Sequence, residues 1–279
     1  MKFEKWQALG NDYVIVERDE LPWDLTPERV RRLSEPHFGV GSDGILVLSD
    51  AQDARHVAEL RIFNADGSEA ELSGNGARQA ALYLRRSGWT EEDEFSILTK
   101  AGEIRPTIVS PTTASLAMGR ASVRSPDFPS GGEDGTGSLT AGGREWRFQH
   151  VSIGNPQCVI EAGGQLDELE LGVIGPQIER SELFPNRTNV SFVQLDGSTV
   201  RARIFERGVG ETLSSGTGAS GAAVVACLRG AISPITVKLD GGELSVEVSG
   251  ELDVRLTGAA EPVFAGRLSP ELVRALEEG

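Results

Sequence analysis

The sequence repeats itself over a long distance, and this repetition constrains the fold more than any other feature. The motif "RIF" at 61–63 occurs again at 203–205, an offset of 142 residues. The glycine-rich run "ELSGNGARQA" at 71–80 has a near copy, "LSSGTGASGA", at 213–222. Matched blocks in the same order, at a spacing far longer than any solenoid repeat, indicate two copies of one domain.

Composition suggests where one copy ends and the next begins. Residues 119–143 are rich in Gly, Ser and Pro and lack periodicity, which is typical of a linker or a long connecting loop. We therefore expect an N-terminal domain over 1–118 and a C-terminal domain over 119–262. Residues 263–279 are expected to pack back on the first domain through a short closing helix that ends at Gly279.

Short runs rich in Val, Ile and Phe, separated by turn residues, predict strands in both halves. The strongest runs are 12–17, 44–49, 58–64, 95–100, 157–162, 190–195, 200–206 and 244–250. The Ala-rich segments 77–86 and 219–230 predict buried helices. The expected class is α/β, of the α+β type. It comprises two pseudo-symmetric domains, each a curved, mostly antiparallel sheet or barrel around a central helix, with an active site in the cleft between them.

Charge and composition exclude several classes of function. The formal net charge of −15 argues against nucleic-acid binding, which requires a basic face. No run approaches the roughly 18 apolar residues of a membrane span, and the charged N-terminus is not a signal peptide. The two cysteines form no disulfide framework and the three scattered histidines suggest no metal site. We therefore expect a cytoplasmic protein without a bound metal.

The two glycine-rich turns precede the two predicted helices. Backbone N–H groups at a helix start lack internal partners and carry partial positive charge, so they attract anions. Ser73 and Ser215 occupy the mouths of these turns at matched positions. Facing each other, the two turns would hold one carboxylate from both ends.

Polar residues flank both turns and suit a zwitterion. An arginine matches a carboxylate, a glutamate matches an ammonium, and amides orient both. The residues concerned are Asn11 with its repeat mate Asn155, Asn64 with its repeat mate Glu206, then Arg207 and Asn189. A small dipolar molecule such as an amino acid is therefore the expected ligand.

The chain resembles diaminopimelate epimerases from end to end. The resemblance is carried, in order, by "LGNDYV", "GVGSDG", "RIFNADGSEAELSGNGAR", "GNPQ", "FPNRTNVSFV" and "ERGVGETLSSGTGAS". It implies a cofactor-independent isomerase that converts LL- to meso-diaminopimelate for lysine and peptidoglycan precursor synthesis. It also suggests a homodimer.

The resemblance assigns roles at the matching positions. Ser73 and Ser215 stand at the two catalytic positions, one for each face of the α-carbon. The substrate-binding positions are Asn11, Asn64, Gly74, Asn75, Asn155, Asn189, Glu206, Arg207, Gly216 and Thr217. The backbone of Gly74, Asn75, Gly216 and Thr217 would hold the carboxylate at the reacting carbon. No cofactor or metal is implied.

The sequence departs from the family at the proton-transfer groups. The family has cysteines where this chain has Ser73 and Ser215, and a histidine where it has Gln157. A thiol with a pKa of about 8.5 costs roughly 2 kcal/mol to ionise at pH 7, whereas an unassisted hydroxyl, at about 15.7, costs on the order of 12 kcal/mol. That difference is about seven powers of ten in rate. A serine base needs a basic partner, and the one obvious candidate, Glu206, is expected to hold substrate.

Three explanations for the serines stay open: an engineered inactivation, a natural loss or change of chemistry, or slow catalysis with help from another group. Three functions follow. The first is an epimerase of the diaminopimelate type. The second is a protein that binds an amino acid without chemistry. The third is a related isomerase or lyase that uses one acid/base group.

Overall fold

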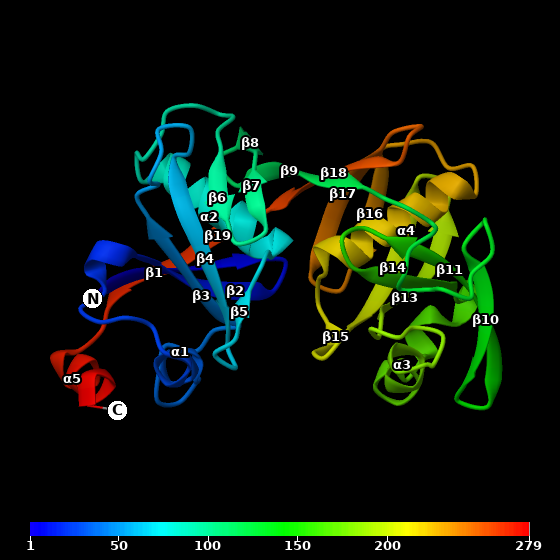
Figure 1. Cartoon of the computed structure of the whole chain (residues 1–279), viewed down its shortest axis with the longest axis horizontal. Helices are drawn as coiled ribbons and strands as arrows, with labels where there is room; N and C mark the ends of the chain where they lie inside the picture. Colours follow the sequence, from blue (N-terminus) through cyan, green and yellow to red (C-terminus); the bar gives the residue numbers. More distant parts are fainter. Residues whose placement is uncertain (279) are drawn as a thin grey trace. The chain divides into compact units, whose positions relative to one another are not determined.

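The computed structural model describes residues 1–278 and divides into two compact units (Figure 1). Unit 1 comprises Met1–Leu116 together with the segment from Gly258 onward, and unit 2 comprises Ala117–Thr257. The chain passes between them inside two strands, β9 (Thr113–Arg120) and β18 (Asp253–Ala259).

Unit 1 contains one sheet and three α-helices. Its helices are α1 (Pro27–Ser34), α2 (Gly74–Arg86) and α5 (Pro270–Glu278). Its strands are β1 (Lys2–Ala8), β2 (Asn11–Glu17), β3 (Gly44–Ser49), β4 (Ala58–Asn64), β5 (Glu69–Ala70), β6 (Ile97–Thr99), β7 (Gly102–Ile104), β8 (Pro106–Ser110) and β19 (Glu261–Arg267). Of these, β8 pairs with β9 at the end of the second sheet.

Unit 2 has a similar pattern of strands, with two α-helices instead of three. Its helices are α3 (Leu171–Glu179) and α4 (Gly216–Leu228). Its strands are β10 (Thr136–Ala141), β11 (Arg144–Ser152), β12 (Pro156–Glu161), β13 (Asn189–Asp196), β14 (Thr199–Glu206), β15 (Gly210–Thr212), β16 (Ile235–Leu239) and β17 (Gly242–Val248). Short 3-10 helices, η1 (Arg18–Glu20) and η2 (Gly163–Glu168), follow β2 and β12.

Strand order confirms the internal duplication. The first sheet runs β19-β1-β2-β3-β4-β6-β7, and the second contains β10-β11-β12-β13-β14-β16-β17 in the corresponding order. The parallel pairs also correspond, β2–β3 with β12–β13 and β4–β6 with β14–β16. Most remaining pairs are antiparallel, so the predicted class of mostly antiparallel sheets with a central helix is confirmed.

Each sheet packs on one helix whose first turn consists mostly of small residues. Helix α2 contacts β1, β2 and β3, and α4 contacts the strands from β11 to β14 as well as β16 and β17. A Cβ atom on Gly218 would lie 2.7 Å from Ile204 Cδ1, and one on Gly76 would lie 3.1 Å from Leu46 Cδ2. These glycines therefore let the helix starts approach the sheet, which brings the serine turns against strand ends.

The segment 119–143, expected to be a linker or a long connecting loop, is a loop only over residues 121–135, between β9 and β10. The whole segment lies in unit 2, and its last part forms β10, which pairs with β11 from Thr136 to Ala141. This strand lies at the end of the sheet order and alternates between exposed and partly buried residues. Its Gly, Ser and Thr composition therefore reflects a solvated edge strand rather than a flexible connection.

The C-terminal helix α5 packs against α1 and is hydrogen-bonded to it. The Arg29 guanidinium donates to the Leu276 carbonyl at 2.6 Å, and Leu276 is buried in one cluster with Val30 and Phe3. The helix starts where Ser269 Oγ accepts from the Leu272 N–H at 3.2 Å. Its predicted end at Gly279 lies outside the described residues.

Candidate active site

The first serine turn is a capped helix start. Ser73 is the N-cap of α2, with extended backbone, and its Oγ accepts the Gly76 N–H at 3.1 Å. The Tyr13 hydroxyl, which projects from β2, donates to the same Oγ at 3.4 Å. Ser73 therefore has a fixed orientation at the N-terminus of a helix whose first turn favours anions.

Asn11 and Asn75 are joined beside this serine. Asn75 Nδ2 donates to Asn11 Oδ1 at 3.2 Å, and Asn11 Nδ2 donates to Asp43 Oδ2 at 2.8 Å. Gln79, one turn further along α2, donates to the Asn11 carbonyl at 3.0 Å. Asn11 and Asn75, both predicted to bind substrate, are thus held by a network that includes Asp43, from the loop before β3.

A buried cation, which the sequence analysis missed, underlies the first turn. Arg78 is fully buried, and its guanidinium donates to Asn75 Oδ1 at 2.7 Å and to the Gly74 carbonyl at 3.3 Å. Within residues 1–278 it pairs with no carboxylate, and burial lowers its pKa to about 10. In the sequence this arginine is visible only as the end of the motif "GNGAR". That it is buried without a carboxylate beside it depends on the fold and cannot be predicted from the motif.

Asn64 lies at the end of β4, opposite Gly44. Its side chain donates to Ser68 Oγ at 3.0 Å and its backbone N–H donates to the Ser68 carbonyl at 2.9 Å. The structure therefore places Asn64 in the turn between β4 and β5.

The second serine turn has the same cap but different partners. Ser215 is the N-cap of α4 and accepts the Gly218 N–H at 3.3 Å. Its hydroxyl also donates to Glu206 Oε2 at 2.9 Å, while the Thr212 hydroxyl donates to Glu206 Oε1 at 2.8 Å. Burial raises the pKa of Glu206, and the two hydroxyl donors offset part of this rise.

Asn155 repeats the arrangement of Asn11. Its Nδ2 donates to Thr217 Oγ1 at 3.3 Å. Asn11 is joined to Asn75 at the equivalent place in unit 1, although there Asn75 is the donor. Gln157 is fully buried and donates to Asn155 Oδ1 at 2.6 Å. Gln157 therefore holds the Asn155 side chain in one orientation.

Asn189 and Arg207 are brought together at the end of β14. Asn189 Oδ1 accepts the Arg207 N–H at 2.8 Å, and the exposed guanidinium donates to the Asn186 carbonyl at 2.8 Å. Buried Glu179, at the end of α3, accepts the Gly208 N–H at 2.8 Å and pairs with Arg187. Glu179 was not predicted as a site residue; in the sequence it is the single carboxylate of an otherwise mostly apolar segment.

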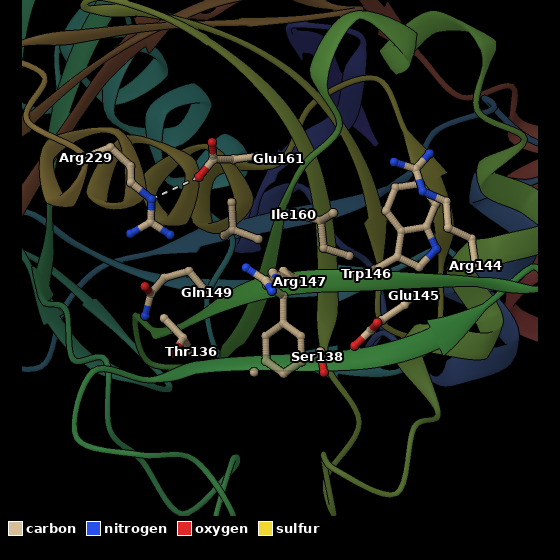
Figure 2. Close-up of a pocket in the computed structure, with 13 residues that line it drawn as sticks. Thr136, Ser138, Arg144, Glu145, Trp146, Arg147, Gln149, Ile160, Glu161 and Arg229 are labelled. Carbon is tan, nitrogen blue, oxygen red and sulfur yellow. Dashed lines mark hydrogen bonds and ion pairs between the residues drawn. The ribbon is translucent and has the colours of Figure 1, made fainter.

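A separate pocket lies over β10, β11 and β12 of unit 2 (Figure 2). It is lined by Trp146, stacked on Arg144, and by an ion pair of 3.0 Å between Arg229 and Glu161. None of the residues predicted for the site lines this pocket.

Residues 1–278 show neither a cluster of metal ligands nor a helix that could span a membrane. No group of three His, Cys, Asp or Glu side chains is arranged to hold a metal ion. None of the helices in this range combines the length and the apolar character needed to cross a membrane.

Comparison with known proteins identifies the family. The family model described as Diaminopimelate epimerase matches residues 3–124 and 149–263. Diaminopimelate epimerase 2 of Nostoc sp. is 40% identical, over 98% of this chain and 97% of its own. Diaminopimelate epimerase of Synechococcus sp. is also 40% identical, over 95% and 97% of the two chains. The chain belongs to the diaminopimelate epimerase family.

Solved structures carry the same fold at lower identity. A probable proline racemase from Agrobacterium radiobacter K84 covers 98% of this chain and 95% of its own, with a TM-score of 0.67 and 17% identity. Diaminopimelate epimerases are isomerases by name, so this chain is a member of an isomerase family. The break in the family match, over 125–148, coincides with the stretch that contains β10.

Proposed function

We propose that this member of the diaminopimelate epimerase family binds diaminopimelate and exchanges the proton on its α-carbon without a cofactor. The observation that carries the proposal is the matched pair of capped turns. Ser73 and Ser215 are the N-caps of equivalent helices, and each hydroxyl accepts the N–H three residues on. Such a pair supplies two first-turn anion sites with a proton-handling group at each.

The proposed roles follow the family positions. Backbone groups of Gly74, Asn75, Gly216 and Thr217 bind the carboxylate at the reacting carbon. The side chains of Asn11, Asn64, Asn155, Asn189, Glu206 and Arg207 orient the rest of the zwitterion. The networks through Asp43 and Gln157 support this assignment, because they fix Asn11 and Asn155 in orientation. The lysine and peptidoglycan precursor pathways are the proposed context.

The test is deuterium uptake at the α-carbon of LL-diaminopimelate in heavy water. Wild-type protein is expected to incorporate deuterium, and the Ser73→Cys, Ser215→Cys double variant is expected to do so at least about 100-fold faster, because thiols ionise far more readily than hydroxyls. Lack of deuterium with both proteins would reject the proposal. Calorimetry on the same samples reports binding separately from chemistry.

An isomerase or lyase with a single acid/base group is the second candidate. It is favoured by the difference between the two serines: Ser215 hydrogen-bonds to the Glu206 carboxylate, whereas Ser73 hydrogen-bonds to the Tyr13 hydroxyl. Product analysis against a panel of amino acids, including proline derivatives and histidine, distinguishes it from an epimerase. Deuterium uptake without inversion in every substrate would favour this candidate.

A further inference from the structure

Three elements of unit 2 converge on one carboxylate. Strand β14 ends at Glu206, β15 ends at Thr212, and α4 begins just after Ser215. Both oxygens of Glu206 accept a hydroxyl, one from Thr212 at 2.8 Å and one from Ser215 at 2.9 Å. This arrangement holds the carboxylate against the hydroxyl that occupies a catalytic position of the family.

Unit 1 lacks this arrangement. The repeat mate of Glu206 is Asn64, which donates to Ser68. Among the described residues, Ser73 Oγ contacts the Gly76 N–H and the Tyr13 hydroxyl and no carboxylate. The two halves therefore differ in acid/base capacity, although their caps are alike.

The hydrogen bonds around Ser215 leave a path for a proton. Its hydroxyl donates to Glu206 and accepts one N–H, from Gly218. A hydroxyl oxygen has two lone pairs, so one acceptor position remains for an incoming proton. Burial raises the pKa of Glu206, which makes its carboxylate a stronger proton acceptor than an exposed one.

We propose that Glu206 is the proton acceptor of this protein and takes the α-proton of the bound amino acid through the Ser215 hydroxyl. The inference rests on the proposed function and deepens it. As the Cα–H bond breaks, its proton bonds to Ser215 Oγ, the hydroxyl proton passes to Glu206 Oε2, and the electron pair stays on the substrate. Return of a proton along the same path exchanges the α-hydrogen with retention, whereas delivery of a proton to the opposite face inverts the carbon, and Ser215 is ionised in neither case.

The experiment is a double-mutant cycle that measures deuterium uptake by LL-diaminopimelate at saturating concentration. The four proteins are wild type, Glu206→Gln, Ser215→Cys, and the variant with both changes. In the wild-type background, Glu206→Gln is expected to slow uptake about 1000-fold, within the range of a general base. In the Ser215→Cys background it is expected to cost less than about 10-fold, because a thiol forms its own thiolate.

Equal penalties in both backgrounds would overturn the inference, because a group that only binds the substrate ammonium matters equally with either side chain. Uptake by Ser215→Cys but not by wild type would also overturn it, because the Ser215 hydroxyl would then relay no proton to Glu206. No uptake even by the double cysteine variant would reject the proposed function itself.

The matched control is Glu211→Gln, which changes a nearby carboxylate that pairs with Arg203 at 2.7 Å. It is expected to leave uptake within about twofold in both backgrounds. Calorimetric titration of each variant with diaminopimelate verifies that the rates refer to saturated protein. A penalty for Glu211→Gln as large as that for Glu206→Gln would contradict a specific role of Glu206.

Discussion

At the scale of single residues, the two halves differ most in the charged group beside each serine turn. Unit 1 holds the Arg78 guanidinium under its serine turn, where unit 2 has Ser220, which donates to the Gly216 carbonyl at 2.8 Å. Unit 2 holds the Glu206 carboxylate beside its serine, where unit 1 has Asn64. Burying a charge without an ionic partner opposes folding, so retaining both groups is consistent with a role in ligand chemistry.

Glu206→Gln is expected to stabilise the fold at neutral and higher pH. Because burial raises the pKa of Glu206 in the folded state, its contribution to stability is present below the ordinary carboxyl range and is lost as pH rises through the elevated pKa. Glutamine does not titrate. The variant should gain about 1.4 kcal/mol relative to wild type for each unit of pKa elevation. Urea unfolding of both proteins between pH 4 and pH 8 measures this difference. A variant whose free energy of unfolding falls relative to wild type as pH rises would contradict the prediction.

At the scale of elements, each serine turn depends on how closely its helix approaches the sheet. Gly218 faces the Ile204 side chain at a distance that excludes a methyl group, and Gly76 faces the flexible end of Leu46 at a slightly longer distance. Helix α4 is buried along most of its length, so it has little freedom to move away. The start of α4 therefore has less room for an added methyl group than the start of α2.

Gly218→Ala is expected to lower the free energy of unfolding by about 1–3 kcal/mol, because the added methyl group overpacks the start of α4. Gly76→Ala should cost less, since Leu46 has an end that can shift. The control is Gly172→Ala in α3, where nothing lies within 4 Å and alanine should stabilise by up to about 1 kcal/mol. Chemical denaturation of the three variants measures the change in the free energy of unfolding for each. Equal changes at Gly218 and Gly172 would contradict the packing argument.

Much of this element-level organisation could be predicted from the sequence. The repeat offset predicted equivalent strands and helices, and both serine caps followed from the turn motifs. Helix α1 was missed although Thr26 and Pro27 form a recognisable helix start, with Thr26 Oγ1 accepting the Arg29 N–H. The sequence named Glu206 as the candidate basic partner of a serine, but its hydrogen bond to Ser215 could not be predicted, because that bond depends on where β14, β15 and α4 converge. Strand β10 was not predicted, because its Gly, Ser and Thr residues resemble those of a loop.

At the scale of the whole molecule, the two units are built from the chain in different ways. The strand beside β11 in unit 2 is β10, which directly precedes it, whereas the strand beside β1 in unit 1 is β19, from the far end of the chain. Phe3 of β1 packs edge-on against Phe264 of β19, with ring centroids 5.9 Å apart. Unit 2 is therefore continuous in sequence and unit 1 is closed by its C-terminal segment.

A chain ending at Thr257 is expected to lose the folded structure of unit 1 while unit 2 stays folded. The truncation removes β19 and α5, which exposes the edge of β1 and the apolar cluster around Val30. Urea unfolding should then show one transition, at the midpoint found for a separate fragment of residues 117–257. Two transitions with unchanged midpoints would refute the expectation.

The position of β19 also has a consequence for biosynthesis. The ribosome makes β1 early and β19 near the end, so the nascent N-terminal half waits with an open strand edge while the middle of the chain can already complete its own core. The half that is translated first therefore completes its sheet last, and until β19 is made the edge of β1 is open to pairing with other chains.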